Sequence, residues 1–332
     1  MQTKRHSIPL RPSERAPTFD PSHAPLLNEA WGYSRNRYQQ ISAALSQSLP
    51  EYVACTAVSG SLARMEAHQH SDIDLLLVID DRAIKVSDSE AIGTFDQAWD
   101  QLDALGALRP KSGGIFSQCV RWKDLTDPSV KGRVDESLVT FGHRIQLLVD
   151  AQPVTSAGRF CELQGEILDW YSETRLASIF DEPGPFHWLW HDVQRYWRSL
   201  RSRTCWLKAD DTEKSVALNV KLRSSRFMLI FAFLSTLHQQ QHLHLHQPTA
   251  TLISDIQQAL TLTPAERLLG TAESAIGLTS WEEIWAYLQQ SVSRPTEHLP
   301  APIKDALEQL AQSIDESIGT DRRISQNRHW IA

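Results

Sequence analysis

The stretch that most constrains the fold of this chain is the pair Gly60-Ser61, which ten residues separate from Asp72 and Asp74. Apolar runs precede the pair and follow the aspartates. Short apolar runs bounded by turn residues are typical of buried strands. Glycine supplies the backbone freedom that a tight turn requires. We therefore expect a strand over 52–58, a Gly-Ser turn, a short helix and a second strand that carries both aspartates.

The two aspartates indicate the chemistry of this stretch. Side chains alternate between the faces of a strand, so Asp72 and Asp74 are expected to point the same way. Two carboxylates on one face repel each other unless a cation lies between them, and Mg²⁺ is usually held by one or two carboxylates together with substrate phosphates. The turn at Gly60 lets the backbone approach a ligand, and the N-terminus of the next helix offers N–H groups to an anion. The arrangement predicts nucleotidyl transfer with Mg²⁺ or Mn²⁺ at the aspartates.

The fuller pattern is Gly-Ser-x-Ala-Arg-x-Glu-x-x-x-x-Ser-Asp-Ile-Asp over residues 60–74. It resembles the DNA polymerase β-like nucleotidyltransferase superfamily, and within it the domains related to PII-uridylyltransferase and the minimal nucleotidyltransferase domains. The resemblance implies a metal-dependent enzyme that transfers an NMP group from an NTP to a hydroxyl acceptor. It implies catalytic and metal-binding roles for Asp72 and Asp74. The nucleotide contacts that it implies are Gly60, Ser61, Arg64 and Ser71.

A third catalytic carboxylate, usual in that superfamily, is expected on a strand near 115–122, where this chain has no acidic residue. Other acids can replace it only if the chain folds back toward the site. The candidates are Asp124, Asp127, Asp135 and Asp150. Two alternatives follow: an enzyme whose third carboxylate comes from elsewhere, or a degenerate fold that binds nucleotide, or acts as an antitoxin-like regulatory module, without catalysis.

The arrangement of apolar residues predicts an α+β protein, in which a small mixed-sheet nucleotidyltransferase domain precedes an all-helical domain. Helical spacing of apolar residues predicts helices over 26–49, 87–105 and 137–149. The run 147–154 resembles the segment that follows the catalytic module in uridylyltransferase relatives. We therefore place the domain boundary near Pro153. The expected divisions are a loose arm (1–25), the nucleotidyltransferase domain (26–153), the helical domain (154–320) and a polar tail (321–332).

Two segments of the helical domain, 192–203 and 219–227, carry basic residues among aromatic ones. If these helices close over the acidic residues, their cations could bind the triphosphate or an acidic acceptor. The alternative is that they form solvated helix faces paired with nearby acids. The cations concerned are Arg195, Arg198, Lys221 and Arg223.

Composition limits the class of protein. A net charge of −7 argues against an extended nucleic-acid surface. The four cysteines form no Cys-x-x-Cys pair and are expected to be reduced. The longest apolar run, 227–234, is too short to span a bilayer. We therefore expect a soluble, cytoplasmic protein whose partners are an NTP and an acceptor of unknown identity, which could be a protein. The histidine-rich stretch 238–246 has no assigned role.

Overall fold

The structure is a computed structural model that describes residues 10–46, 48–172, 185–207, 212–243, 248–270, 275–291 and 298–318. Its centre is a four-stranded mixed sheet in the order β3-β2-β1-β4. Strand β1 (Val53–Ser59) pairs antiparallel with both β2 (Asp74–Ile79) and β4 (Gln152–Thr155). The short strand β3 (Val120–Arg121) lies parallel to β2 at one edge. The expected α+β fold, with a small mixed sheet followed mostly by helices, is confirmed.

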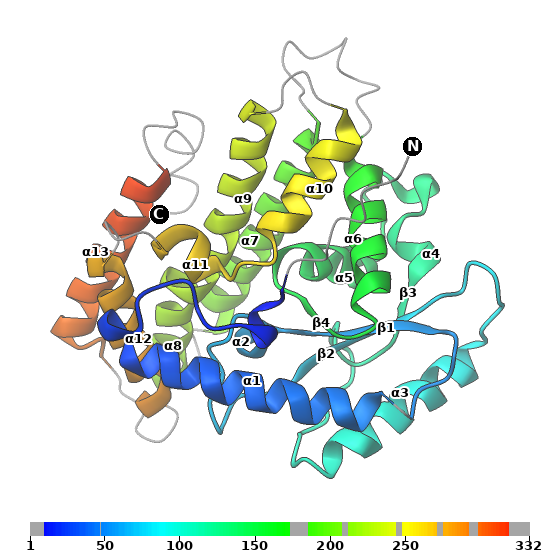
Figure 1. Ribbon diagram of the computed structural model, residues 1–332, viewed down its shortest axis with the longest axis horizontal. Helices are drawn as coiled ribbons and strands as arrows, with labels where there is room; N and C mark the ends of the chain where they lie inside the picture. The colour runs from blue at the N-terminus through cyan, green and yellow to red at the C-terminus, as the bar shows by residue number, and fades with distance from the viewer. Residues whose placement is uncertain are drawn as a thin grey trace.

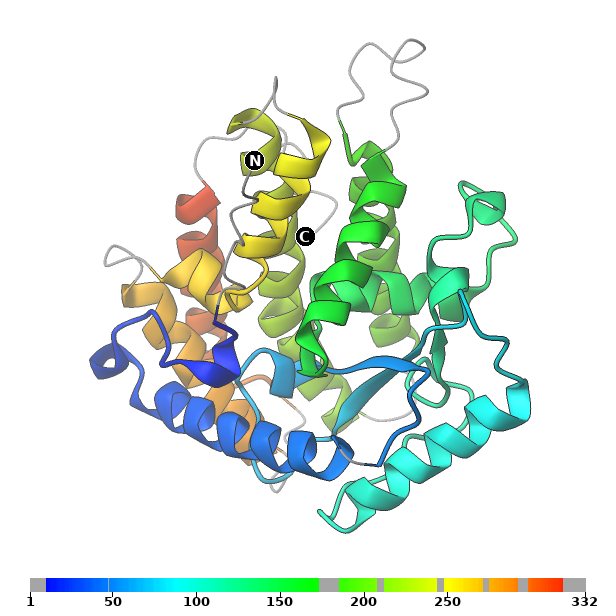
Figure 2. The ribbon, with the colours of Figure 1, turned by 45° about the vertical axis from the view of Figure 1, so that its right-hand side comes forward.

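Helices α1 (Pro25–Leu45) and α3 (Asp88–Asp103) lie beneath the sheet, as Figures 1 and 2 show. They pack on the face that carries Leu75, Leu77 and Ile79. Both helices were predicted from their apolar spacing. Helix α3 begins with a capping box, in which Ser87 Oγ accepts the Glu90 N–H at 3.3 Å and the Glu90 carboxylate accepts the Ser87 N–H at 2.8 Å.

The opposite face of the sheet packs against the helical region, which stands above it in Figures 1 and 2. Leu76 and Val78 of β2 share one apolar core with α5 (Leu138–Val149), α6 (Ala157–Ser172) and α9 (Ser225–Leu243). Asp74 has the same parity in β2 as Leu76 and Val78, so it lies on the same face. This alternation directs the first residue of β2 toward the helical region.

The other helices that the structure describes complete this upper layer or connect it to the sheet. They are α2 (Gly60–Ala63), α4 (Trp122–Leu125), α7 (His187–Leu207), α8 (Thr212–Arg223), α10 (Thr249–Ala259), α11 (Pro264–Leu269), α12 (Ala275–Ser291) and α13 (Ala301–Ile318). Helices α8 and α9 follow each other almost directly and are separated at Ser224. The Ser224 carbonyl accepts the Met228 N–H at 2.8 Å, at the start of α9.

The strand expected over 115–122 is only two residues long. Ile115 does not join the sheet, because its carbonyl oxygen is bonded by the ring of His143 on α5. Its side chain packs directly on Gly142, where a Cβ would lie 2.9 Å from the Ile115 side chain. The preceding segment turns at Gly113, which has a positive φ of 86°.

The N-terminal arm, expected to be loose, is anchored over its described part. Arg15 Nη1 lies 2.5 Å from Glu266 Oε1 on α11, and Trp31 Nε1 donates to the Arg15 carbonyl at 3.0 Å. Arg11 donates to the Pro153 carbonyl at 2.9 Å. Residues 1–9 and the polar tail predicted over 321–332 lie outside the described residues. The boundary predicted near Pro153 falls within β4, which belongs to the sheet.

Candidate active site

The turn at Gly60 joins β1 to the short helix α2. Gly60 has φ +72°, a left-handed conformation that side chains disfavour. A Cβ at this position would lie 2.6 Å from Asp74 Oδ2. The sheet register explains the approach, since Ser59 pairs directly with Asp74. Glycine is therefore required here both for its conformation and for the contact with the carboxylate.

Asp72 and Asp74 are placed differently from the expectation that one strand carries both. Strand β2 begins at Asp74, and Asp72 lies before it in a segment without regular structure. The buried Ile73 between them packs in the core below the sheet, and Asp74 lies on the opposite face of β2. Asp72 is exposed and Asp74 is partly buried. The charge of Asp72 contributes to the raised pKa of Asp74, which indicates that the two groups are near each other.

Asp150 provides a third carboxylate at this turn. It directly follows α5, and the register Val58↔Gln152 between β1 and β4, extended by two residues, places it opposite Gly60. The Gly60 N–H donates to Asp150 Oδ2 at 3.2 Å, and Ser59 Oγ donates to the same oxygen at 3.4 Å. The sequence analysis included Asp150 only as one of four acids that could reach the site if the chain folded back. The pairing of β4 with β1 brings Asp150 to the turn.

Arg64, expected to contact nucleotide, binds two carboxylates. Its Nη1 donates to both Asp150 oxygens at 2.8 Å, and its Nε donates to Glu66 Oε2 at 3.0 Å. The three side chains are buried, with exposed fractions of 12, 7 and 7%. Burial raises the pKa of Glu66 to about 7, although the guanidinium of Arg64 opposes the rise. Arg64 thus orients Asp150 beside the turn.

Nearby carboxylates raise the pKa of Asp74. Burial raises the pKa of Asp74 to about 6, the charges of Asp150 and Asp72 add to this effect, and Arg64 and Arg226 oppose it. Burial also raises the pKa of Asp150, and Arg64 opposes that rise. A site in which anionic oxygens crowd together favours a bound cation. Among the described residues, however, no three His, Cys, Asp or Glu side chains are already grouped as a metal site.

A buried chain of hydrogen bonds connects the turn to α5 and α7. Ser59 Oγ donates to Gln146 Oε1 at 2.5 Å, and Gln146 Nε2 donates to the hydroxyl of Tyr196. Burial raises the pKa of Tyr196, and the charge of Asp150 adds to the rise. The sequence analysis missed Gln146 and Tyr196, because neither belongs to a recognisable motif. The sequence indicated only that Gln146 lies within a segment of helical apolar spacing.

The two serines predicted to bind nucleotide differ in their contacts. The hydroxyl of Ser61 has no hydrogen-bond partner in the part of the chain that the structure describes. Ser71 Oγ accepts the His68 N–H at 3.0 Å, and the Ser71 N–H donates to the His68 carbonyl at 2.9 Å. Ser71 therefore closes the loop before Asp72, whereas Ser61 keeps its hydroxyl available to a ligand.

Of the four predicted helical cations, Lys221 faces the acids. Burial lowers the pKa of its ammonium, as do the charges of Arg226 and Arg64, whereas Asp72 and Asp74 act in the opposite direction. Lys221 is exposed to solvent. Arg226, which the sequence analysis did not select, is partly buried, and the charge of Asp150 acts on it.

The other three predicted cations lie elsewhere. Arg195 packs over the ring of Phe141 at 3.7 Å and forms ion pairs with Glu136 at 3.6 Å and Asp192 at 3.5 Å. Arg195 therefore follows the alternative in which these cations pair with nearby acids. Arg198 is exposed on α7, where its charge lowers the pKa of His191. Arg223 is exposed at the end of α8.

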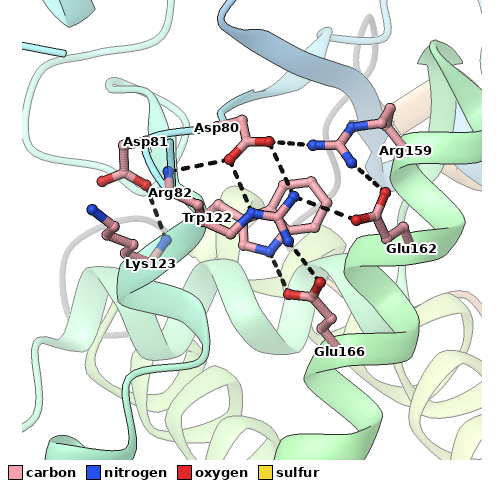
Figure 3. A network of polar contacts seen from close by, with 8 residues as sticks. All are labelled: Asp80, Asp81, Arg82, Trp122, Lys123, Arg159, Glu162 and Glu166. Atoms are coloured by element: carbon pink, nitrogen blue, oxygen red, sulfur yellow. Dashed lines mark hydrogen bonds and ion pairs between the residues drawn. The ribbon is translucent and has the colours of Figure 1, made fainter. Parts of the chain in front are cut away.

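A second polar cluster, shown in Figure 3, lies at the other end of β2. It begins at Asp80, six residues and about 20 Å along the strand from Asp74. The guanidinium of Arg82 lies 3.8 Å from the centre of the Trp122 ring, and it bonds Asp80 at 2.9 Å and Glu166 at 2.7 Å. The charged groups of this cluster pair with one another, and their contacts connect the loop after β2 to α6.

An open hollow of about 600 Å³ lies beside this cluster. It is lined by residues 81–88 with Arg121 and Lys123. None of the residues that meet at the Gly60 turn lines it. We therefore place the candidate active site at the turn, where Asp74, Asp150 and the glycine backbone meet.

Comparison with known proteins supports the same region. The family model described as "Putative nucleotidyltransferase DUF294" matches residues 32–127. The matched range includes the Gly60 turn, Asp72 and Asp74, and it ends before α5 and Asp150. The match supports a general nucleotidyl-transfer activity with a nucleotide substrate.

No curated protein and no solved structure gives a significant match to this chain. Within the described residues, none of the helices combines the length and the apolar character that a membrane span requires.

Proposed function

Since residues 32–127 belong to the nucleotidyltransferase superfamily, we propose that this protein transfers an NMP group from an NTP to the hydroxyl of an acceptor. The observation that supports this most is the convergence at one turn. Gly60 contacts Asp74 through its backbone and bonds Asp150 through its N–H. Carboxylates from β2 and from the end of α5 thus approach the same glycine.

The residues fit a divalent metal ion. Three carboxylates offer the oxygen ligands that Mg²⁺ and Mn²⁺ prefer. The effect of Asp150 and Asp72 on the pKa of Asp74 supports a site in which the protein does not fully compensate the negative charge. Asp72 and Asp74, with Asp150 as a third oxygen donor, would hold the metal ion. When bound, the ion would neutralise phosphate charge and polarise the α-phosphate.

The proposed transfer forms one P–O bond and breaks another. The acceptor hydroxyl oxygen attacks the α-phosphorus and forms a new P–O bond. The bond from that phosphorus to the bridging oxygen breaks, and pyrophosphate leaves. The hydroxyl proton passes to solvent water, because the carboxylates of the cluster would be ligands of the metal ion. The Ser61 hydroxyl, which has no hydrogen-bond partner among the described residues, would contact the β- and γ-phosphates.

One observation favours the non-catalytic alternative, a nucleotide-binding or antitoxin-like regulatory module. Both oxygens of Asp150 accept hydrogen bonds from Arg64, and no three metal-binding side chains are grouped within the described residues. A site held in that arrangement could bind nucleotide without transferring it. The two functions differ in whether a labelled product forms.

The deciding experiment incubates the protein with each α-labelled NTP, Mg²⁺ or Mn²⁺, and a cell lysate. We expect a labelled product with the parent protein and none with Asp74→Asn. The control Asp305→Asn changes an exposed acid of α13 and should retain the labelling. If nucleotide stabilises the parent against heat but no NTP labels any product, the non-catalytic alternative holds. If nucleotide has no effect on Asp74→Asn or the parent, both fail.

A further inference from the structure

A cavity of about 390 Å³ lies beside β4, apart from the Gly60 turn. Its walls come from β4, α6, α10 and the N-terminal arm. Helices α6 and α10 stand side by side above β4 in Figures 1 and 2. Ala151 and Gln152 of its wall directly follow Asp150, but none of the residues assigned to the candidate active site lines it. Its volume is typical of a small-molecule site, which encloses roughly 300–1,000 Å³.

Two glutamines in this wall are anchored through their amide nitrogens. Gln152 Nε2 donates to the Leu260 carbonyl at 3.2 Å, and Gln257 Nε2 donates to the Cys161 carbonyl at 2.6 Å. A backbone carbonyl only accepts hydrogen bonds, so the amide nitrogen has to face it and the amide oxygen has to face away. Among the described residues, no donor bonds either Oε1. Each glutamine therefore brings an unpaired acceptor to the wall of the cavity.

The hydroxyls of the wall add to these acceptors. The Thr261 hydroxyl donates to the Gln258 carbonyl at 2.7 Å, so its oxygen can only accept a bond from a ligand. Ser254, exposed at the rim on α10, has no hydrogen-bond partner within the described part of the chain. Because most of these groups accept, a ligand that fits the wall has to bring the donors.

The described part of the wall offers a ligand neither a free charge nor an aromatic ring. Of the described residues that line the cavity, only Arg11 is charged. Its guanidinium is paired with Glu14 at 2.5 Å and bonds the Pro153 carbonyl at 2.9 Å. The aromatic residue of the same set is Phe160, which is 2% exposed and belongs to the apolar core. A phosphate or an ammonium group would find no counterion here, and a nucleobase would find no ring to stack on.

We propose that this cavity binds an uncharged sugar or polyol, whose hydroxyls donate to the oxygens of Gln152, Gln257 and Thr261. A hydroxyl is a donor and an acceptor at once, so the same ligand can also accept the proton of Ser254. Apolar side chains such as Pro153 contact its C–H surface. The inference goes beyond the proposed function and does not depend on it, because the cavity is separate from the nucleotide site.

Cys161, which also lines the cavity, can report whether it is occupied. The full chain is treated with the uncharged reagent iodoacetamide, and alkylation of each cysteine is followed by mass spectrometry. The reaction is run at alkaline pH, because burial raises the pKa of Cys161 and the thiolate is the reactive form. A panel of uncharged monosaccharides, disaccharides and inositols is tested. We expect at least one to slow alkylation of Cys161 roughly tenfold at about ten times its Kd, while the exposed Cys205 reacts as before.

Two variants assign this protection to the amide oxygens. Gln257→Leu and Gln152→Leu should each raise the half-protecting sugar concentration roughly tenfold, the size of a lost hydrogen bond. Gln101→Leu makes the same change at an exposed glutamine of α3 and should leave the protection unchanged. Cys55 is fully buried, so its alkylation identifies a variant that has unfolded.

A second comparison uses the parent protein alone and needs no variant. The phosphate ester of the protecting sugar should protect Cys161 at least about tenfold less well, because its charge would lose hydration without gaining a counterion. Equal protection by the ester overturns the proposal. So does a Cys161 that never reacts, a panel in which no sugar protects it, or full protection in both glutamine variants. The proposed function is tested separately, since a protein that labels no product with any NTP can still show this protection.

Discussion

At Asp74, burial and the charges of Asp150 and Asp72 raise the carboxyl pKa from 3.8 to about 6. A group whose pKa is higher in the folded state contributes stability at low pH and loses it as the pH rises through the folded value. We therefore predict that ligand-free Asp74→Asn is more stable than the parent at about pH 8. A rise of about two pH units in this pKa corresponds to a gain in unfolding free energy of roughly 1–3 kcal/mol for the variant.

Thermal melting from about pH 5 to 8 checks this prediction. The advantage of Asp74→Asn should shrink toward pH 5, where the parent carboxyl is protonated and resembles the amide. The same variant should lose the stabilisation by NTP and Mg²⁺ that the parent shows. An Asp74→Asn protein that melts below the parent at pH 8 would contradict the crowding of carboxylates described above.

Gly60→Ala tests the close approach of the turn to Asp74. The added Cβ would stand 2.6 Å from Asp74 Oδ2 at a φ of +72°. Gly106 is a matched control, since it has φ +71° but no atom within 4 Å of a built Cβ. We expect Gly106→Ala to lose only about 1–2 kcal/mol of stability through backbone strain. Gly60→Ala should lose more and should also abolish nucleotide binding; equal effects on stability and unchanged binding would refute the contact.

The local part of the site could be predicted from the sequence, and the distant part could not. Gly60, Asp72 and Asp74 lie within one turn and its flanking strands, so their spacing carries the information. Asp150 lies 90 residues from Gly60 and reaches it only through the pairing of β4 with β1. Arg226 likewise depends on the break at Ser224. Pairing registers and helix breaks are tertiary properties that residue spacing does not encode.

At the scale of the elements, α5 and α7 hold the turn through Gln146. Gln146→Leu would leave the hydroxyls of Ser59 and Tyr196 without this partner, and buried unpaired groups cost about 1–3 kcal/mol each. We expect a lower melting temperature and a lower kcat, because Asp150 is held by the same Ser59. Substrate KM should change less.

Gln164→Leu provides the control. Gln164 is as buried as Gln146, and it bonds the Leu147 carbonyl at 2.9 Å from α6, away from the turn. It should lower the melting temperature similarly while the folded protein keeps its kcat. If both variants reduce kcat by the same factor, the bond from Gln146 to Ser59 has no special role in positioning Asp150.

Apolar spacing predicted α1 and α3 well, because each of them has one buried face and one exposed face. It also predicted α5, which is buried throughout Phe141–Val149, but it does not reveal the break between α8 and α9, where apolar residues occur on several faces. Met228, Leu229 and Ile230 of α9 are all buried, since the helix contacts two apolar cores. A helix surrounded by protein has no polar face whose interruption could reveal the break at Ser224.

At the scale of the whole molecule, the two predicted domains share their cores. One core joins Ala57 and Leu76 of the sheet to Leu229 and Phe233 of α9. A second core joins Trp31 of α1 to helices α12 and α13. Near Pro153 the predicted secondary structure changes from strands and helices to helices alone. Such a change does not show where one buried core ends and another begins.

This sharing predicts that residues 10–155 do not fold alone. The fragment keeps all four strands, but the sheet face with Leu76 and Val78 would lose α6 and α9 and be exposed to water. Exposed apolar area costs about 25 cal/mol per Å², and several fully buried side chains together exceed the net stability of a typical domain. We expect the fragment to lack a cooperative thermal transition. The full chain should unfold in one step, with coincident far-ultraviolet dichroism and tryptophan fluorescence, since Trp99, Trp122 and Trp281 report on all three apolar cores. A fragment that melts cooperatively would show that the sheet is an independent domain.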